Sequence, residues 1–197
     1  MFSRIARRYD LMNRLLSAFM DIPWRKKAAK ACSPGKRVLD LCMGSGDMAL
    51  AWLNVHQDGA VVGLDFCREL LARVKQKSGG NSRISMVEGD ALQLPFPEKA
   101  FDAVMCAFGM RNLEDIEKGV REVVRVVRSG GCCVILEFFR PDHWLSRLIY
   151  ASYGRYVIPF AGRWIAADSE AYEYLPDSIE NFLSIEEFKE LMIKAGF

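Results

Sequence analysis

Glycines and acidic residues come together in the stretch from Leu39 to Asp47, which reads Leu-Asp-Leu-Cys-Met-Gly-Ser-Gly-Asp. An apolar strand pattern leads into a turn with Gly44 and Gly46, and a helical pattern follows. Glycine has no β-carbon, so the backbone of such a turn can approach a ligand closely. The first N–H groups of the following helix have no partner inside it and can bind polar groups of that ligand. The stretch therefore predicts a nucleotide-binding turn.

A second acid lies where the next apolar run, 61–64, ends in Asp65. This carboxylate follows the glycine turn by roughly 20 residues, the spacing at which an acid binds the hydroxyl groups of a ribose. The alternative is that Asp65 only caps the helix that starts near Cys67. The glycine turn and the acid together favour the ribose.

Asp40, inside the first apolar run, bears on which nucleotide binds. The turn also fits the dinucleotide fingerprint loosely, because Ala49 stands in its last position. The first strand of a dehydrogenase, however, runs between two helical layers, where a buried and unpaired carboxylate is costly. In an S-adenosylmethionine site an acid there can pair with the ammonium group of the ligand's methionine end. We therefore predict S-adenosylmethionine rather than a nicotinamide dinucleotide.

The composition predicts one globular domain that spans residues 1–197, of which 51% are hydrophobic and 26% are charged. The net charge of +2, with basic residues spread along the chain, does not indicate a nucleic-acid partner. The 6 cysteines lack the spacing of a metal site or a disulfide framework, so we expect reduced thiols in an intracellular protein and no metal. No apolar run reaches the ~18 residues of a membrane span, and the basic start of the chain lacks the apolar core of a secretion signal.

Apolar runs alternate with helical patterns along the chain. The expected strands are 37–42, 60–65, 83–88, 101–108 and 132–138, and the expected helices are 47–56, 67–77 and 114–127. This alternation predicts an α/β fold, a doubly wound, Rossmann-like parallel sheet with helices on both faces. We expect Gly130 and Gly131 to end the third of these helices.

Two segments lie outside this alternation. Residues 1–31 are expected to form a helical arm ahead of the first strand. Residues 140–184 are rich in aromatic side chains, and we expect a small helical subdomain that acts as a lid over a large apolar substrate. The reason is that open sheets bind ligands beyond the carboxyl ends of their strands.

The last helix is expected to open on a capping box of Ser184 and Glu187 and to end at Gly196. The chain then ends at Phe197, without the two strands with which sheets of this type commonly finish. The fifth strand is therefore expected to be an exposed edge, unless the chain is truncated or a partner covers that edge.

Six stretches together carry a resemblance to one family. They are Phe2 to Asn13, the glycine turn with Asp47, Gly89 to Pro97, Phe108 to Asn112, Leu136 to Phe138, and Tyr172 to Ile179. The Tyr-Asp-x-Met-Asn and Phe-Gly-x-Arg-Asn segments are far more specific than the glycine turn. Over essentially its whole length the chain resembles the ubiquinone/menaquinone-biosynthesis C-methyltransferase family, whose plant and cyanobacterial members act on phylloquinone precursors. It departs from the family pattern at Met43, where members usually have a small residue, and at Cys67, where they often have serine.

The resemblance implies a class I methyltransferase with S-adenosylmethionine as its cofactor, and it assigns the cofactor's parts to residues. Ser45 with its glycine neighbours would hold the amino-acid end, Asp65 the ribose, and Asp90 with Ala91 the adenine. An acid in a short loop can accept a hydrogen bond from an exocyclic amine, although Gly89 and Asp90 are also typical of a simple turn. The complete predicted cofactor set is Asp40, Gly44, Ser45, Gly46, Asp65, Phe66, Asp90, Ala91 and Ala107.

The implied reaction moves a methyl group from the sulfonium to a ring carbon of a reduced quinone. Such a carbon is a poor nucleophile unless the adjacent hydroxyl, whose pKa is near ~10, loses its proton. Arg111 keeps its own proton, so we expect it to stabilise the phenolate or to orient the water that takes the proton, with Asn112 positioning. A surface salt bridge from Arg111 to Glu114 or Asp115 is the alternative. Tyr9 and Asp10 are expected to close the site from the arm; the alternative is that they only dock the arm to the sheet.

The acceptor implied by the resemblance is a prenylated quinol: demethylmenaquinol, demethylphylloquinol or a ubiquinol precursor. The sequence leaves three other functions open, namely methylation of another small molecule, a non-catalytic cofactor-binding subunit of a quinone-synthesis complex, and a dehydrogenase. It also leaves open a peripheral contact with a membrane and a homodimer or larger complex.

Overall fold

The computed structural model describes residues 9–32, 35–144 and 176–197. Most of the predicted lid, 145–175, and the first part of the predicted arm, 1–8, lie outside the described residues. The predictions made for those two segments therefore remain predictions.

Five parallel strands form one sheet, as the apolar runs predict, and their order in it is β3-β2-β1-β4-β5. A reversal of strand order next to β1 opens a crevice beyond the carboxyl ends of the strands, where such sheets bind ligands. The strands are β1 (Arg37–Leu41), β2 (Ala60–Asp65), β3 (Ile84–Glu88), β4 (Phe101–Ala107) and β5 (Val127–Leu136).

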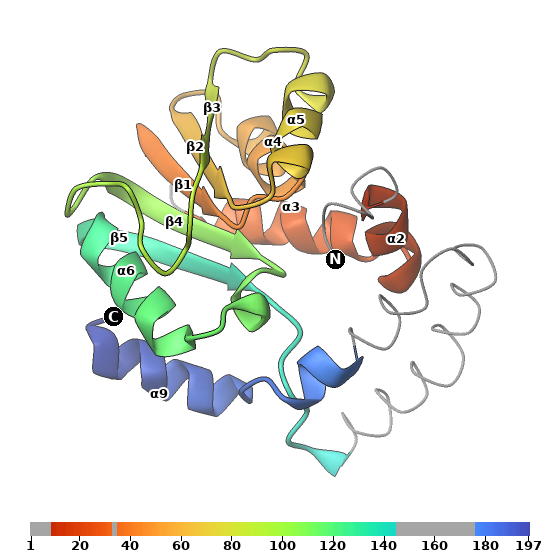
Figure 1. The fold of residues 1–197 in the computed structure, drawn as a ribbon, viewed down its shortest axis with the longest axis vertical. Coiled ribbons are helices and arrows are strands. Elements are labelled where there is room, and N and C mark those ends of the chain that lie inside the picture. Colours follow the sequence, from red (N-terminus) through yellow and green to blue (C-terminus); the bar gives the residue numbers. More distant parts are fainter. Residues whose placement is uncertain (1–8, 33–34, 145–175) are drawn as a thin grey trace.

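Helices cover both faces of this sheet (Figure 1). One face carries α3 (Asp21–Ala31), α4 (Asp47–Val55) and α5 (Arg68–Lys77), and the other carries α6 (Ile116–Val126) and α9 (Ile185–Ala195). Successive residues of a strand point to opposite faces of the sheet and so belong to two different cores. Val38 and Met105 pack with Trp52 on the first face. Leu39 and Val104 pack with Val120 on the second. The remaining described elements are α2 (Tyr9–Leu16) in the arm and the 3-10 helix η1 (Met110–Asn112) after β4.

The prediction that Gly130 and Gly131 end a helix is wrong. Helix α6 ends at Val126, and β5 begins at the next residue. Phe101 pairs with Val127 and Ala103 with Cys132, so the intervening residues 128–131 form a bulge in β5. Gly130 has a φ of 75°, and a β-carbon on Gly131 would lie 2.6 Å from the carbonyl oxygen of Asp102. The bulge therefore requires both glycines, and β-bulges commonly contain glycine.

The predictions for the last helix are confirmed. Ser184 and Glu187 form both bonds of a capping box, and Gly196 ends α9 in the left-handed conformation with a φ of 119°. At the start of α5, Cys67 occupies the cap position without a side-chain capping bond, which is where the family pattern often has serine. In the described part of the sheet, β5 is an edge strand, and whether a further chain pairs with it stays a prediction.

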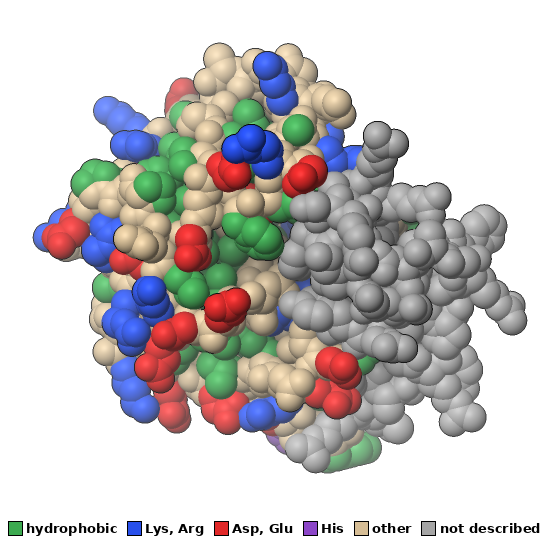
Figure 2. All heavy atoms as spheres, in the orientation of Figure 1, with side chains coloured by type: hydrophobic (Ala, Val, Ile, Leu, Met, Phe, Trp, Pro, Cys, Tyr) green, Lys and Arg blue, Asp and Glu red, His purple; other side chains and the backbone are tan. Residues whose placement is uncertain are grey.

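The surface and the cysteines agree with the composition. Figure 2 shows acidic and basic side chains interspersed over the described part of one face, rather than a single basic band. All six cysteines are among the described residues, and none forms a disulfide bond. Within the described ranges, no helix is long and apolar enough to cross a bilayer.

Met43 is accommodated by a glycine in the neighbouring strand. Its side chain is 5% exposed and packs over Gly63 of β2, where an added β-carbon would overlap the Sδ atom. We expect Gly63→Ala to lower the free energy of unfolding by about 1–3 kcal/mol, because it overpacks this contact. Urea denaturation measures the change.

The control for this prediction is the same substitution in a Met43→Ala background. Without the thioether side chain the new methyl group has room, so Gly63→Ala should then cost little. An equal cost in both backgrounds would show that the strain comes from somewhere other than the Met43 contact.

Candidate active site

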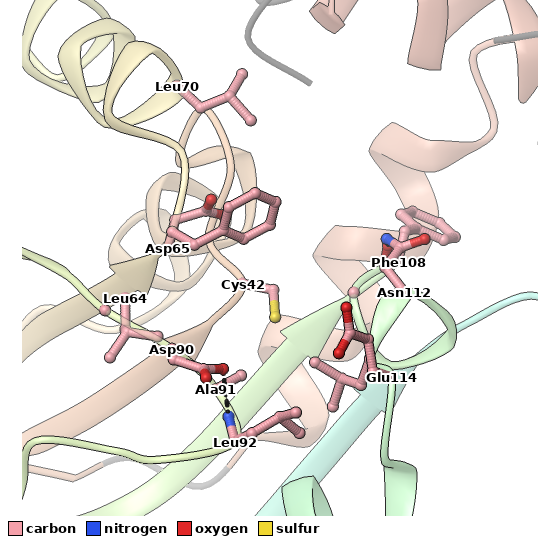
Figure 3. Close-up of a pocket in the computed structure, with 14 residues that line it drawn as sticks. Cys42, Leu64, Asp65, Leu70, Asp90, Ala91, Leu92, Phe108, Asn112 and Glu114 are labelled. Atoms are coloured by element: carbon pink, nitrogen blue, oxygen red, sulfur yellow. Dashed lines mark hydrogen bonds between the residues drawn. The ribbon is translucent and has the colours of Figure 1, made fainter. Parts of the chain in front are cut away.

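One cavity of about 420 Å³ lies beyond the carboxyl ends of β1, β2 and β4, beside the loop after β3. Asp65, Phe66, Asp90 and Ala91, all predicted to bind the cofactor, line it together with Asn112. In Figure 3, Asp65, Asp90 and Ala91 lie on one side of the cavity, Phe108 and Asn112 on the other, and Cys42 between them. The remaining lining residues are Leu64, Leu70, Gly89, Leu92, Gly109, Leu113 and Glu114.

Asp65 connects the end of β2 to the glycine turn. Its Oδ2 accepts a hydrogen bond of 2.8 Å from the Gly44 N–H, and its Oδ1 accepts one of 2.9 Å from the Cys67 N–H. The second bond corresponds to the capping alternative. Burial raises the pKa of Asp65 despite these bonds. Each carboxylate oxygen has a second lone pair, so a ribose hydroxyl can still donate to this group.

Asp90 shapes the loop after β3. Its Oδ1 accepts a hydrogen bond of 2.8 Å from the Leu92 N–H, drawn dashed in Figure 3, and its carbonyl oxygen accepts one of 3.1 Å from the Gln93 N–H. The segment is therefore a turn, and Ala91 at its centre is buried against the cavity. The same carboxylate is exposed and keeps acceptor capacity for an amine.

Asp40 lies in the middle of the sheet and is fully buried. Its Oδ2 accepts a hydrogen bond of 2.9 Å from the Ala49 N–H in the first part of α4. Its Oδ1 is buried and has no hydrogen-bond partner among the described residues. Burial raises the pKa of Asp40 to about 8, although the Ala49 bond and the charge of Arg25 oppose that rise. An unpaired carboxylate oxygen of this kind suits the ammonium group of an amino-acid ligand.

Most of the predicted cofactor set is divided between two places. Asp40, Ser45 and Ala107 do not line the main cavity; they line a separate space of about 10 Å³. A space of that size holds no more than about one water molecule. Gly44 and Gly46 line neither space.

Helix α2 of the arm contacts the glycine turn and α5 through Asp10. Asp10 in α2 accepts a hydrogen bond from the Ser45 hydroxyl, and it accepts bonds of 3.2 Å each from Arg73 and Lys77 of α5. Burial would raise the pKa of Asp10, but Ser45 and the two cations bring it below its ordinary value. Lys77 also donates to Ser45 Oγ at 3.0 Å and pairs with Asp47. Helix α2, the glycine turn and α5 are therefore held together around Ser45.

The structure adds residues that sequence reasoning did not place in the site. Cys42 and Phe108 line the main cavity at the ends of β1 and β4, with φ values of 53° and 61°. Gly109 lets the two strand ends approach, because a β-carbon there would lie 2.5 Å from the Cys42 Cβ. Positive φ outside glycine is strained and concentrates at functional sites. The Phe108 segment was visible in the sequence only as part of the family resemblance.

Arg111 does not reach the main cavity. Its Nη1 pairs with Glu137, which directly follows β5, and also donates to the Phe108 carbonyl at 3.0 Å. The Arg111 side chain is 10% exposed and that of Glu137 is 0% exposed. Burial raises the pKa of Glu137 although Arg111 lowers it. The expected alternative, a surface bridge to Glu114 or Asp115, is thus replaced by a buried pair with another partner.

Tyr9 and Asn112 were the other predicted catalytic residues. Tyr9 begins α2, and its side chain lies outside what the structure describes. Asn112 lines the main cavity, and its Nδ2 donates to the Phe108 carbonyl at 3.2 Å.

Comparison with known proteins identifies the family of this chain. The model of the ubiE/COQ5 methyltransferase family matches residues 1–197. This chain belongs to that family. It is therefore an S-adenosylmethionine-dependent C-methyltransferase of quinone biosynthesis, as the sequence predicted, and not a dehydrogenase.

Relatives and solved structures agree with this assignment. The chain is 44% identical to the demethylmenaquinone methyltransferase of Thermus thermophilus, over 100% of this chain and 91% of the relative. It is 43% identical to a ubiquinone/menaquinone biosynthesis C-methyltransferase of Geobacter sulfurreducens, over 100% of this chain and 79% of the relative. A SAM-dependent methyltransferase of Thermotoga maritima has the same fold, with a TM-score of 0.70 at 19% identity over 100% of this chain and 79% of its own.

Because the pKa of Asp40 is raised, we expect the free energy of unfolding to depend on pH. In the unfolded chain the carboxyl loses its proton near 3.8, whereas in the folded chain it keeps it to about 8. Between these values the folded state binds more protons, so the free energy of unfolding falls as pH rises, by on the order of 1 kcal/mol per pH unit. Asp40→Asn keeps an acceptor for the Ala49 N–H and should remove this contribution.

Urea denaturation of both proteins without cofactor, from about pH 5 to about pH 9, tests it. The stability of wild type relative to Asp40→Asn should decline up to about pH 8 and then level off. Saturating S-adenosylmethionine should flatten the decline, because its ammonium group stabilises the carboxylate. Parallel curves for the two proteins would mean that Asp40 does not hold its proton in the folded state.

Proposed function

We propose that this methyltransferase acts on a ring carbon of a reduced, prenylated naphthoquinol, demethylmenaquinol. The support is the name of its relatives: proteins from Thermus thermophilus and Deinococcus radiodurans, 44% and 41% identical to this chain, are demethylmenaquinone methyltransferases. A ubiquinol precursor is a second acceptor, because the Geobacter relative is named for both quinones. The observation that carries the cofactor assignment is the buried, unpaired Asp40 Oδ1 beside the glycine turn.

The chain's own residues have separable roles in this proposal. When bound, S-adenosylmethionine supplies an electrophilic methyl group on a sulfonium. Asp40 and Ser45 hold the amino-acid end, Asp65 binds the ribose, and Asp90 accepts from the adenine amine. Gly44, Gly46, Phe66, Ala91 and Ala107 shape the walls against which these groups lie.

Arg111 acts on the acceptor. We propose that its guanidinium stabilises the phenolate or orients the water that removes the hydroxyl proton, while Asn112 positions the ring and Tyr9 closes the site from the arm. Arginine does not give up its proton, so the pair with Glu137 fixes a cation that lasts through the reaction. That guanidinium lies 5.9 Å from the centre of the Phe138 ring, on the side of the molecule where β4 and β5 end.

The α2–α3 turn is proposed to contact an anionic membrane, where a prenylated quinol resides. Phe19, Met20 and Ile22 are 55%, 46% and 51% exposed. Behind them on the outer face of α3, Lys26 and Lys30 follow Ile22 at helical spacing and are exposed. An apolar tip backed by lysines fits an anionic lipid surface.

Replacing Arg111 by Gln should lower kcat with a short-tailed naphthoquinol by on the order of 100-fold or more, because the phenolate loses a charged hydrogen-bond donor. The dissociation constant for S-adenosylmethionine, measured by calorimetry, should stay unchanged, since Arg111 does not line the cofactor cavity. Arg128→Gln is the control, because its ion pair with Asp102 lies at the opposite end of the sheet.

Removing Arg111 alone also leaves the buried Glu137 without its cation, which destabilises the fold. The double variant Arg111→Gln with Glu137→Gln removes both charges and separates the two effects. We expect it to fold and to remain inactive. Normal turnover in the double variant would limit Arg111 to a structural role.

Changing Phe19, Met20 and Ile22 together to Ser should reduce binding to vesicles of phosphatidylcholine with phosphatidylglycerol, measured by sedimentation, by on the order of tenfold. Turnover of a soluble acceptor without a tail should be unaffected. Ile193→Ser, at a site 68% exposed on α9, is the control and should leave vesicle binding as it is. Undiminished binding of the triple variant would place the lipid contact elsewhere.

A further inference from the structure

A second cavity, of about 890 Å³, lies between the α2–α3 turn, the segment after β5 and the start of α9. Its walls are largely apolar and aromatic, and charged groups such as Arg140 and Asp142 also line it. Its volume is in the range of small-molecule sites. The apolar walls are formed mainly by Met20, Trp24, Phe138, Phe139, Ile179 and Ile185.

The two cavities share no lining residue, yet they meet at one aromatic pair. Phe108 lines the cofactor cavity and Phe138 lines the apolar cavity. Their rings are stacked with centroids 5.0 Å apart and planes 27° apart. Trp24 continues the series with its edge against Phe138, at 5.9 Å. A row of aromatic rings thus runs from the cofactor cavity to the apolar cavity. The Arg25 guanidinium also lies over the Phe108 ring, 5.0 Å from its centroid, so a ligand here meets ring edges rather than a gap between the rings.

Glu137 is one of the charged residues that line the apolar cavity, and it is already paired. Its carboxylate is buried, pairs with Arg111 and accepts a hydrogen bond of 2.9 Å from the Phe138 N–H. The wall around Glu137 and Phe138 is therefore unsuited to an ionic ligand and suited to a hydrocarbon. The lining also includes Ala18 and Met20, on either side of the exposed Phe19.

We infer that this cavity binds the first isoprene units of the acceptor's tail, with the quinol ring against the edges of the Phe108–Phe138 pair. The inference rests on the proposed function, since it takes a prenylated quinol as the acceptor. The ring then lies between the cofactor cavity and the hydrocarbon cavity, and a longer tail leaves by the α2–α3 turn. Tail recognition is separate from the chemistry, so it affects KM rather than kcat.

The test compares two acceptors at saturating S-adenosylmethionine, a naphthoquinol without a tail and the same ring with two isoprene units, both kept reduced with dithionite. The wild-type enzyme should have a KM for the tailed acceptor at least tenfold lower, at similar kcat. Ile185→Gln should raise the KM for the tailed acceptor about tenfold and leave the tail-less acceptor unchanged.

Ile193→Gln is the matched control, because both isoleucines are exposed on α9 and only Ile185 lines the cavity. Ile193→Gln should leave both KM values as they are. Two results would show that the tail does not occupy this cavity: an equal KM of the wild-type enzyme for both acceptors, or an equal effect of Ile185→Gln on both. In either case the inference fails, and the proposed quinol substrate is unaffected. If neither acceptor is methylated, the proposed substrate is wrong and the inference falls with it.

Discussion

Two buried carboxylates hold the cofactor turn in place, and the rest of the site depends on them. Asp40 accepts from the Ala49 N–H, and Asp65 accepts from the Gly44 N–H. Burial raises the pKa of both acids, which shows that removing their charged forms from water is unfavourable. They satisfy backbone N–H groups that a sharp turn leaves without helical partners. The same two groups are those that the ammonium and the ribose of the cofactor would meet, so turn geometry and ligand recognition share one set of atoms.

The arm contacts the glycine turn through charged and polar side chains. Asp10, Ser45, Asp47 and Lys77 form one network of hydrogen bonds and ion pairs across α2, the glycine turn and α5. It fills the space around Ser45 and Asp47, where about 10 Å³ remain, whereas the cavity beside Asp65 has about 420 Å³. If a ligand's amino-acid end binds Ser45, as proposed, it competes with Asp10 for the Ser45 hydroxyl. The sequence left two roles for the arm, closure of the site and docking to the sheet, and the contact between Asp10 and Ser45 is compatible with both.

The sequence predicts those features that depend on the periodicity of apolar residues and on local interactions such as helix capping. Apolar runs gave the five parallel strands, and parallel strands bring their carboxyl ends to one edge, so Asp65, Asp90, Ala91 and Asn112 surround one cavity. Capping chemistry predicted the bounds of α9. These features depend on residues close together in the chain, which is why single-sequence reasoning reaches them.

The features that escaped prediction depend on tertiary contacts. Arg111 was weighed against its sequence neighbours Glu114 and Asp115, whereas its partner Glu137 is delivered by a different strand. Gly130 and Gly131 resemble a helix stop, but the pairing of β5 with β4 turns them into a bulge. Cys42 was not predicted to be in the site; it lines the cavity at the end of β1, where it has a positive φ and where Gly109 approaches it closely.

The buried pair of Arg111 and Glu137 connects the chemistry to the walls of the site. Glu137 follows β5 and Arg111 follows β4, so their ion pair joins the carboxyl ends of the two strands. Phe138, next to Glu137, stacks on Phe108, whose carbonyl oxygen accepts a hydrogen bond from Arg111. A buried ion pair is weak support for stability, because desolvation offsets most of its attraction. The pair instead fixes positions: it holds a permanent cation close to the stacked rings of Phe108 and Phe138, each of which lines one of the two cavities.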